Sequence, residues 1–329
     1  MIGWLARGRR ALYSSGIRRS NSLPRPVVSV GNLAVGGTGK TPHVLFLADW
    51  LVRLGMRIAI LSRGYGRRSR GVVWASGRNG PPATAENVGD EPALLAASLP
   101  GTPVVVGESR FAAGLECLRV RDADLFLLDD GFQHLSLHRD FDLLLVDGRE
   151  GLGNGRTLPF GPLREPPDHA AYADALVLTR CTEPGRLDRV RREVPFPPGR
   201  PVAASRMVPA GLFDRDGRET PLPDPGEEVA AFAGLARNRQ FSETLADAGF
   251  RVRSFRGFGD HHWYTAGDLA RIREDAMGLP VVTTEKDMIR LPREIPFPVR
   301  ALRIRVEFLS GWEELSRLLL DRIGGRGKD

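Results

Sequence analysis

The stretch Val27-Val-Ser-Val-Gly-Asn-Leu-Ala-Val-Gly-Gly-Thr-Gly-Lys-Thr41 joins an apolar strand, a glycine-rich loop and the start of a helix. Glycines allow backbone N–H groups to wrap around an anion, and the N-terminus of the following helix adds a favourable dipole. The stretch therefore predicts a phosphate-binding loop (P-loop) that holds a nucleotide. The residues expected to contact that nucleotide are Ala34, Val35, Gly36, Gly37, Thr38, Gly39, Lys40 and Thr41.

Two side chains at the end of this loop have specific expected roles. Lys40 is placed to reach the β- and γ-phosphates, and the Thr41 hydroxyl is placed to bind Mg²⁺. The usual pattern begins with glycine, whereas this chain has Ala34 at that position. ATP and Mg²⁺ are thus the predicted cofactors.

A second segment, Leu125-Phe-Leu-Leu-Asp129-Asp130, reads as a buried strand that ends in two carboxylates. A P-loop protein needs an acidic residue at the tip of a nearby strand, where the metal is held. The segment therefore predicts that Asp129 and Asp130 belong to the metal site. The residues leave open which of the two carboxylates binds the metal directly.

The rest of the chain alternates short apolar runs with helical stretches, which is typical of a parallel sheet buried on both faces. We predict an α/β fold: a P-loop NTPase-like parallel sheet flanked by helices, with a second, smaller α/β domain. The strands expected after the P-loop are 58–61, 104–106, 125–128, 143–146 and 175–178, followed by 229–232, 252–255, 281–283 and 302–306.

The predicted domain boundaries follow from composition. A stretch rich in proline, glycine and charge suggests a linker over 209–228. It would separate a P-loop domain at 25–208 from a second α/β domain at 229–329, which includes a last helix over 311–323. Residues 1–24 form a basic N-terminal segment that resembles an interfacial helix.

Composition and charge narrow the function classes. The chain has 329 residues, 42 % of them hydrophobic, and a formal net charge of +7. Seven basic residues precede Asp49, the first acidic residue, so they account for the whole net charge. A positive charge confined to one end of the chain argues against a generally nucleic-acid-binding surface.

Two cysteines are too few for a disulfide framework. With no apolar run of about 18 residues and no secretory signal, we expect neither a spanning helix nor export.

The first 22 residues combine five arginines with apolar side chains, among them Trp4, Leu5 and Leu12. Arginines that face anionic headgroups while tryptophan and leucine enter the acyl boundary are typical of a membrane-surface helix. The alternative is a solvated basic helix that packs on its own domain. We expect contact with an anionic membrane surface, no nucleic acid and no obligate protein partner.

Further motifs follow the P-loop in order along the chain. The motifs are Ser62-Arg-Gly-Tyr-Gly-Arg67, Gly89-Asp-Glu-Pro92, Asp129-Asp-Gly-Phe-Gln-His134, Pro159-Phe-Gly-Pro-Leu-Arg-Glu-Pro166, Asp260-His-His262 and Thr284-Glu-Lys-Asp287. Together with Val30-Gly-Asn-Leu33, this series resembles the tetraacyldisaccharide 4′-kinase family.

The resemblance implies a kinase of lipid A biosynthesis. Such an enzyme transfers the γ-phosphate of ATP to the 4′-hydroxyl of a tetraacyl glucosamine disaccharide 1-phosphate and yields lipid IVA. It implies a peripheral protein at the cytoplasmic face of the inner membrane.

The resemblance also implies a catalytic pair, Asp90 with His261, besides Lys40. A carboxylate that orients an imidazole makes a base able to take a hydroxyl proton during phosphoryl transfer. On its residues alone, Asp90 also fits a helix N-cap, and His262 is an alternative partner. Because the pair lies on two predicted domains, closure of the domains would assemble it.

Other positions match the family's motifs less specifically. Arg164 suits a bidentate phosphate clamp or, equally, an ordinary surface ion pair with Glu165 or another acid. Lys286 is unassigned, and the turn Ala233-Gly-Leu-Ala-Arg-Asn-Arg-Gln-Phe241 lacks the Pro and Glu-Arg that the family tends to carry. The candidate substrate residues are Tyr65, Glu91, Gln133, His134, Arg164 and Glu165.

The main alternative function is a membrane-associated partitioning ATPase, a regulatory switch. Such proteins carry a lysine just before the Gly-Gly pair, where this chain has Val35, and they lack an Asp-His-His segment. A GTPase is disfavoured because no Asn-Lys-x-Asp motif occurs. A kinase of a soluble sugar or nucleoside fits the P-loop but not the basic apolar N-terminus or the family's motifs.

Overall fold

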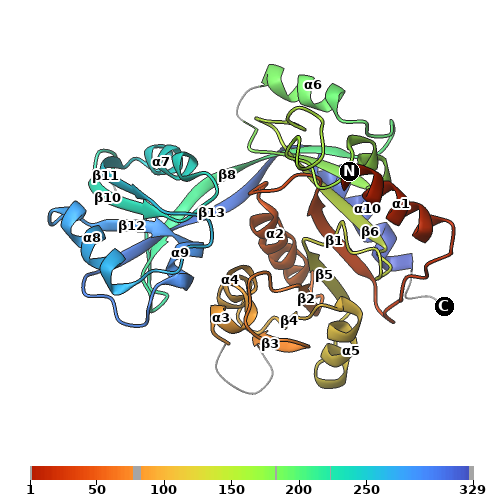
Figure 1. Cartoon of the computed structure of the whole chain (residues 1–329), viewed down its shortest axis with the longest axis horizontal. Helices are drawn as coiled ribbons and strands as arrows, with labels where there is room; N and C mark the ends of the chain where they lie inside the picture. The colour runs from red at the N-terminus through yellow and green to blue at the C-terminus, as the bar shows by residue number, and fades with distance from the viewer. Residues whose placement is uncertain (1, 77–82, 182–183, 223, 326–329) are drawn as a thin grey trace.

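The structure, a computed structural model, describes residues 2–76, 83–181, 184–222 and 224–325. It consists of two lobes joined by two long strands, β8 (Val202–Phe213) and β13 (Val299–Ser310) (Figure 1). These strands pair antiparallel along their length, from Ala301 opposite Phe213 to Ser310 opposite Ala204. The described strands therefore form one sheet of 13 strands, in the order β11-β10-β12-β13-β8-β7-β6-β1-β5-β2-β4-β3, with β9 beside β8.

The first lobe has a parallel sheet with one antiparallel strand at its edge, β3. Side chains alternate between its two faces, and both faces are apolar: Val28 and Val30 join one core cluster, while Val27 joins another. Burial on both faces explains the continuous apolar runs. The strands are β1 (Val27–Asn32), β2 (Ile58–Ser62), β3 (Val73–Ser76), β4 (Val104–Val106), β5 (Leu125–Asp129), β6 (Phe141–Asp147) and β7 (Ala175–Thr179).

Helices cover both faces of this sheet. Leu47 of α2 lies in the core cluster of one face, and Ala113 of α5 lies in the cluster of the other. The elements are α1 (Ile2–Ser14), α2 (Lys40–Arg53), α3 (Ala85–Val88), α4 (Asp90–Ser98), α5 (Arg110–Val120), a 3₁₀ turn (Pro167–Tyr172) and α6 (Pro184–Glu193).

The second lobe adds three parallel strands to β13, in the order β11-β10-β12. Two apolar clusters, one around Phe232 and one around Phe241, cover its faces. Its elements are β9 (Glu219–Thr220), β10 (Glu228–Ala233), α7 (Asn238–Asp247), β11 (Arg251–Gly257), α8 (Ala266–Ala276), β12 (Val281–Thr284) and α9 (Glu285–Arg290). The predicted fold class, a P-loop-type sheet with a smaller α/β lobe, is confirmed.

The connection between the lobes differs from the predicted linker over 209–228. Residues 209–213 are the end of β8, and β9 pairs with that strand. The last helix, α10 (Trp312–Gly324), also departs from the prediction, because it packs on the first lobe: Leu315, Leu319 and Ile323 join the core cluster of α2. The reason is the length of β13, which carries the chain back across the molecule.

The N-terminal helix α1 is anchored on the first lobe by one face only. Arg10 is buried, pairs with Glu165 at 3.0 Å and lies over the ring of Tyr172. The opposite face leaves Trp4 83 % exposed and Leu5 70 % exposed. The segment packs on its own domain, as the second interpretation expects. It also has exposed apolar side chains, which the membrane-surface interpretation requires. Among the described residues no helix is both long and apolar enough to cross a bilayer.

Candidate active site

The P-loop connects β1 to α2 and is fixed by side chains of neighbouring strands. Asn32 Nδ2 donates to Thr38 Oγ1 at 2.8 Å, and Thr179 Oγ1 donates to the Thr38 carbonyl at 3.0 Å. Gly39 has φ +86°, a left-handed conformation that favours glycine. The loop's backbone is therefore preorganised for an anion at the start of α2.

His43, which the sequence reasoning missed, supports the loop from behind. Its Nδ1 donates to the Gly39 carbonyl at 2.7 Å, and its Nε2 lies 2.9 Å from Ser205 Oγ. Burial lowers the pKa of His43 to about 4. The ring is therefore neutral at physiological pH and ties the loop to β8 without adding charge. In the sequence, the signal for this role is the position of His43 in the first turn of the helix that follows the P-loop.

The two carboxylates after β5 have different surroundings. Asp130 has the left-handed φ of 54°, accepts a 2.7 Å hydrogen bond from Arg164 Nη1 and lies 3.7 Å from Lys40 Nζ. Asp129 is buried, and neither of its carboxylate oxygens has a hydrogen-bond partner among the described residues. Burial, reinforced by the negative charges of Glu91 and Asp130, raises the pKa of Asp129 to about 8.

A divalent cation fits this arrangement. A buried carboxylate without a partner is costly, and a bound cation would remove that cost. No group of three or more His, Cys, Asp or Glu side chains suited to a metal is gathered anywhere in the described ranges. Mg²⁺ bound to a nucleotide needs only one or two protein carboxylates, because phosphate oxygens and water complete its coordination.

Asp90 and His261 meet across the two lobes. His261 Nδ1 lies 2.8 Å from Asp90 Oδ2. Asp90 opens α4 and is 5 % exposed; the helix N-cap is Gly89, so the N-cap role that the sequence allowed for Asp90 is not the observed one. Its second oxygen accepts from the Glu91 N–H at 3.0 Å.

Cations of the second lobe surround this carboxylate. Lys286 Nζ and Arg290 Nε each lie 3.7 Å from Asp90 Oδ2, and Lys286 donates to Glu91 at 3.1 Å. Burial acts to raise the pKa of Asp90, but the hydrogen bond with His261 and these two positive charges outweigh it and hold the pKa below its ordinary value. Asp90 is therefore an anion that belongs to the first lobe and is contacted by side chains of the second. Lys286, unassigned from sequence, is one of its counter-ions.

The two adjacent histidines point to different partners. His261 adopts φ 58°, which directs its ring toward Asp90 and within 5.7 Å of the Tyr65 ring. His262 instead contacts Asp268 at 3.1 Å and stacks on Phe258. Of the two partners that the sequence left open, His261 is the one that reaches Asp90.

The other candidate substrate residues separate into two groups. Gln133 Nε2 donates to the Asn32 carbonyl at 2.8 Å, which places it beside the P-loop strand. His134 contacts Arg110, and burial together with that guanidinium lowers the pKa of His134 to about 3. Glu165 does not join them: it is buried with Arg10 and with His169, whose Nδ1 lies 2.9 Å away.

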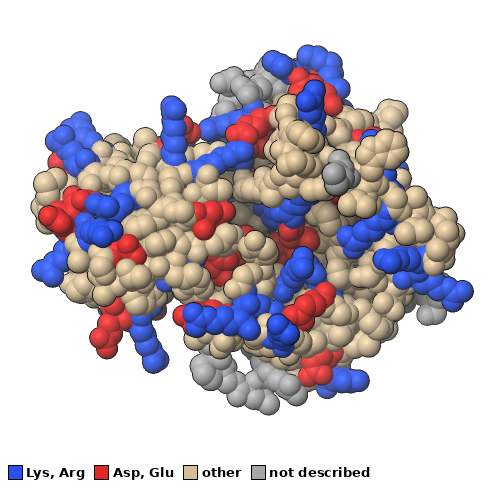
Figure 2. Space-filling model, in the orientation of Figure 1, with Lys and Arg blue, Asp and Glu red and all other residues tan. Residues whose placement is uncertain are grey.

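Arg110 is a second residue that the sequence reasoning missed. It is 5 % exposed, its Nε has no partner among the described residues, and burial lowers its pKa to about 10. In the space-filling view, acidic and basic side chains gather together in the recess between the lobes (Figure 2). No motif marked this arginine, since arginines are abundant throughout the chain.

Comparison with known proteins identifies the family. The sequence profile described as Tetraacyldisaccharide-1-P 4′-kinase matches residues 1–324. The chain is 40 % identical to the tetraacyldisaccharide 4′-kinase of Anaeromyxobacter dehalogenans (94 % of this chain and 85 % of that protein) and 44 % identical to that of Syntrophobacter fumaroxidans (92 % and 81 %).

A solved structure agrees. The crystal structure of the "apo" form LpxK from Aquifex aeolicus in complex with ATP is similar to this chain, with a TM-score of 0.79 and 36 % sequence identity over 98 % of this chain and 96 % of that one. The match therefore includes both lobes and the strands that join them. The chain belongs to the tetraacyldisaccharide-1-P 4′-kinase family.

Proposed function

We propose that this protein is an ATP-dependent kinase that transfers the γ-phosphate of ATP to the 4′-hydroxyl of a tetraacyl glucosamine disaccharide 1-phosphate and yields lipid IVA. The observation that carries the proposal is the Asp90–His261 pair, which meets at 2.8 Å across the lobes in a chain that also has a P-loop. Family membership supports the same activity. The Asp260-His-His262 segment also disfavours a regulatory ATPase of the partitioning type, because such proteins lack it.

The P-loop and Lys40 bind and orient the phosphates. The Lys40 ammonium stabilises the negative charge that develops on the transferring phosphoryl group. Asp130 lies beside Lys40 and accepts a hydrogen bond from Arg164, so these two side chains help to position the lysine. Thr41 and Asp129, with Asp130 beside them, are the residues that would hold Mg²⁺. When bound, Mg²⁺ neutralises charge on the β- and γ-phosphate oxygens.

Asp90 and His261 form the base. Asp90 accepts a hydrogen bond from the Nδ1–H of His261 and so favours the tautomer in which Nε2 carries the free lone pair. Nε2 takes the proton of the 4′-hydroxyl while that oxygen forms its bond to the γ-phosphorus. The bond between the γ-phosphorus and the bridging oxygen breaks, and ADP leaves with the electron pair.

The acceptor binds in the recess that leads to this base. Tyr65, Glu91, Gln133, His134 and Arg164 border the recess in this proposal, and Arg164 already holds Asp130. Glu165 acts indirectly, because it is buried against α1.

The exposed apolar face of α1 suits a peripheral position on an anionic membrane. Trp4 and Leu5 point away from the anchored face, and Arg9, Arg18 and Arg19 are exposed nearby. In this proposal the protein works at the cytoplasmic face of the inner membrane, where α1 brings the recess to the lipid.

The proposal is tested by incubating the protein with γ-labelled ATP, with and without detergent-dispersed tetraacyl disaccharide 1-phosphate. A kinase places label on the lipid and releases little free phosphate without it. Release of phosphate that does not depend on the acceptor would instead indicate the regulatory ATPase.

A further inference from the structure

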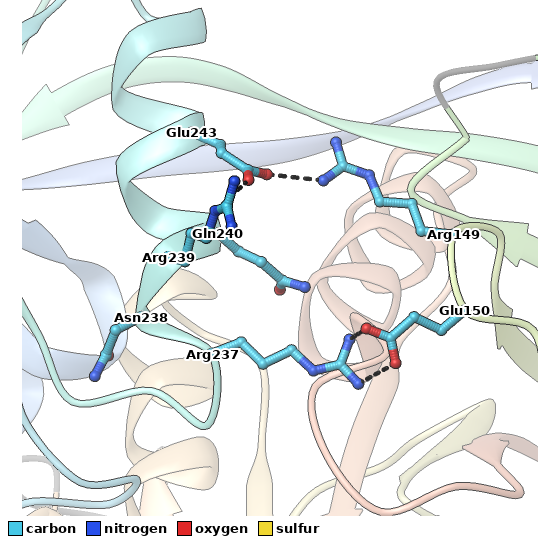
Figure 3. A pocket seen from close by; sticks show the side chains of 7 residues that line it. All are labelled: Arg149, Glu150, Arg237, Asn238, Arg239, Gln240 and Glu243. Carbon is cyan, nitrogen blue, oxygen red and sulfur yellow. Dashed lines mark hydrogen bonds and ion pairs between the residues drawn. The ribbon is translucent and has the colours of Figure 1, made fainter. Parts of the chain in front are cut away.

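Contacts between the lobes, among the described residues, include an exposed set and a buried set. The exposed set borders a pocket of about 430 Å³ and consists of ion pairs between its walls, Arg149 with Glu243 and Arg237 with Glu150 (Figure 3). Exposed ion pairs of this kind contribute little to stability. In the buried set, Asp90 of the first lobe is 5 % exposed and Arg290 of the second lobe is 2 % exposed. Because a buried charge cannot lose its partner without a large cost, this set constrains the interface more strongly.

Arg290, at the end of α9, is held by several groups of its own lobe. Its Nη2 donates to the Asp287 carboxylate at 2.8 Å and to the Gly234 carbonyl at 2.9 Å, and its Nε donates to the Lys286 carbonyl at 3.2 Å. The same Nε lies 3.7 Å from Asp90 Oδ2 across the interface. The second lobe therefore fixes the direction of the planar guanidinium, and with it the position of the charge that Asp90 meets.

Asp287 is the centre of this buried network. Its Oδ1 accepts from the Gly234 N–H at 3.0 Å and from the Tyr264 hydroxyl at 2.6 Å, and its Oδ2 accepts from Thr284 Oγ1 at 2.6 Å. Burial and the negative charge of Asp287 raise the pKa of Tyr264, so its hydroxyl stays protonated and donates. One fully buried carboxylate thus joins Arg290 to Tyr264.

Tyr264 belongs to the loop that carries His261 and follows it by three residues. His261 has φ 58°, and a left-handed backbone at a residue other than glycine persists only where its neighbours hold it. Two side chains after it are anchored: His262 contacts Asp268 at 3.1 Å, and the Tyr264 hydroxyl donates to Asp287. The second of these anchors connects the His261 loop to the network that faces Asp90.

The turn after β10 packs directly on the network. A Cβ atom at Gly234 would lie only 3.1 Å from Asp287 Oδ1, from the Tyr264 hydroxyl and from the Gly259 carbonyl. Little space is therefore left in which the tyrosine or the carboxylate could move, and the contacts around Asp287 have one geometry.

We infer that Tyr264 and Arg290 are positioning residues for the base and that Asp287 joins them. Tyr264 holds the loop of His261, while Arg290 places the second lobe against Asp90. Both members of the base are thus referred to one buried carboxylate, which accounts for their 2.8 Å contact although they come from different lobes. The inference rests on the proposed function, because it assigns no separate activity to these residues.

The first test is Tyr264→Phe, which removes the hydroxyl and keeps a ring that packs on Phe232 and Phe258. We expect kcat for labelling of the tetraacyl disaccharide 1-phosphate to fall about 10-fold, a part of the 10²–10⁴ that a general base supplies. The Kd of ATP should not change, because the P-loop lies in the first lobe. In a His261→Ala background the same exchange should have no further effect, since the hydroxyl acts through His261.

A loss of equal size in both backgrounds, or no loss in the wild-type background, would overturn the inference and leave the kinase proposal intact. Absence of acceptor-dependent labelling by the wild-type protein would instead contradict the proposed function. Phe250→Leu is the control for stability, because Phe250 is buried in the other apolar cluster of the second lobe. It should lower the melting temperature without lowering kcat. A matching fall in its kcat would assign the effect of Tyr264→Phe to stability alone.

The second test is Arg290→Lys, which keeps the buried positive charge beside Asp287 but loses the planar fork. A lysine cannot bond to Asp287 and to the Gly234 carbonyl while it also faces Asp90. We expect kcat to fall about 3- to 10-fold, the value of one hydrogen bond, and the Kd of ATP to stay constant. Wild-type kcat in a folded Arg290→Lys protein, judged by its melting curve, would exclude Arg290 from the positioning role.

Discussion

The P-loop and the Asp90–His261 pair serve the same proposed reaction but are built in opposite ways. The P-loop is one contiguous stretch within one lobe, and backbone groups and buried hydrogen bonds fix it before any ligand arrives. Asp90 and His261 are 171 residues apart and come from different lobes. Their 2.8 Å contact depends on how β8 and β13 hold those lobes.

The difference teaches that the phosphate site and the base are built independently of each other in this molecule. A change in the P-loop alters the charge that stabilises the phosphoryl group, whereas a change at the interface of the lobes alters the geometry of the base. The experiments below test that separation, in order of decreasing expected effect.

Asp90→Ala and His261→Ala should have the largest effect, a loss of about 10²–10⁴ in kcat for each, because general-base catalysis is worth that much. Since the two side chains act as one unit, the double variant should lose little more than either single one. Steady-state kinetics of the three variants checks this. Losses that multiply would assign the residues independent roles, and a comparable loss in His262→Ala would point to the other histidine.

Lys40→Ala should lower kcat by about 10²–10³, the typical value of an electrostatic contact to the transferring group. Its thermal unfolding should match that of the wild-type protein, because the side chain is not part of an apolar cluster. Kinetics combined with a melting curve tests both. A variant with undiminished kcat would refute the P-loop assignment and with it one side of the comparison.

Lys286→Met should move the pH profile rather than abolish activity. The Lys286 charge helps to hold the pKa of Asp90 below its ordinary value, so removing that charge raises the pKa. Asp90 must be ionised to orient His261, and the acid limb of kcat should therefore shift to higher pH. Lys286→Arg keeps the charge and should restore the wild-type limb. An unshifted limb in the methionine variant would separate Lys286 from the base.

Trp4→Glu combined with Leu5→Glu should have the smallest effect on chemistry and act on location. Both side chains are exposed on the free face of α1, and burying an apolar side chain of this size is worth about 1.5–3 kcal/mol, or tenfold or more in partition. Sedimentation with anionic vesicles should fall while ATP affinity stays constant. Leu54→Glu, an exposed leucine after α2, is the matched control. Unchanged sedimentation would place the membrane contact elsewhere.

The parts of this molecule that the sequence predicted are those set by local patterns. Apolar runs at 58–61 and 125–128 have to be strands buried on both faces, and the glycine spacing before Lys40 allows one loop geometry. The pairing of Asp90 with His261 came only from resemblance to a family, because no local rule joins residues from two lobes.

Two features lay beyond local patterns altogether. The return of α10 to the first lobe depends on the length of β13, and an apolar helix reads the same whichever core it joins. Glu165 matched a motif of the recess, but its neighbour is Arg10 on a helix more than 150 residues earlier. Such contacts are decided by tertiary geometry.

The return of α10 has a consequence for how the protein is made. The first lobe's core includes Leu315, Leu319 and Ile323 beside the helix that follows the P-loop. During translation the residues of the first lobe leave the ribosome early, but we expect its core to stay incomplete until α10 has been synthesised. The second lobe lies between β8 and β13 in the chain and can fold in that interval. The P-loop is thus contiguous in sequence, yet the lobe that holds it needs contacts between distant parts of the chain, so we expect this lobe to be completed last.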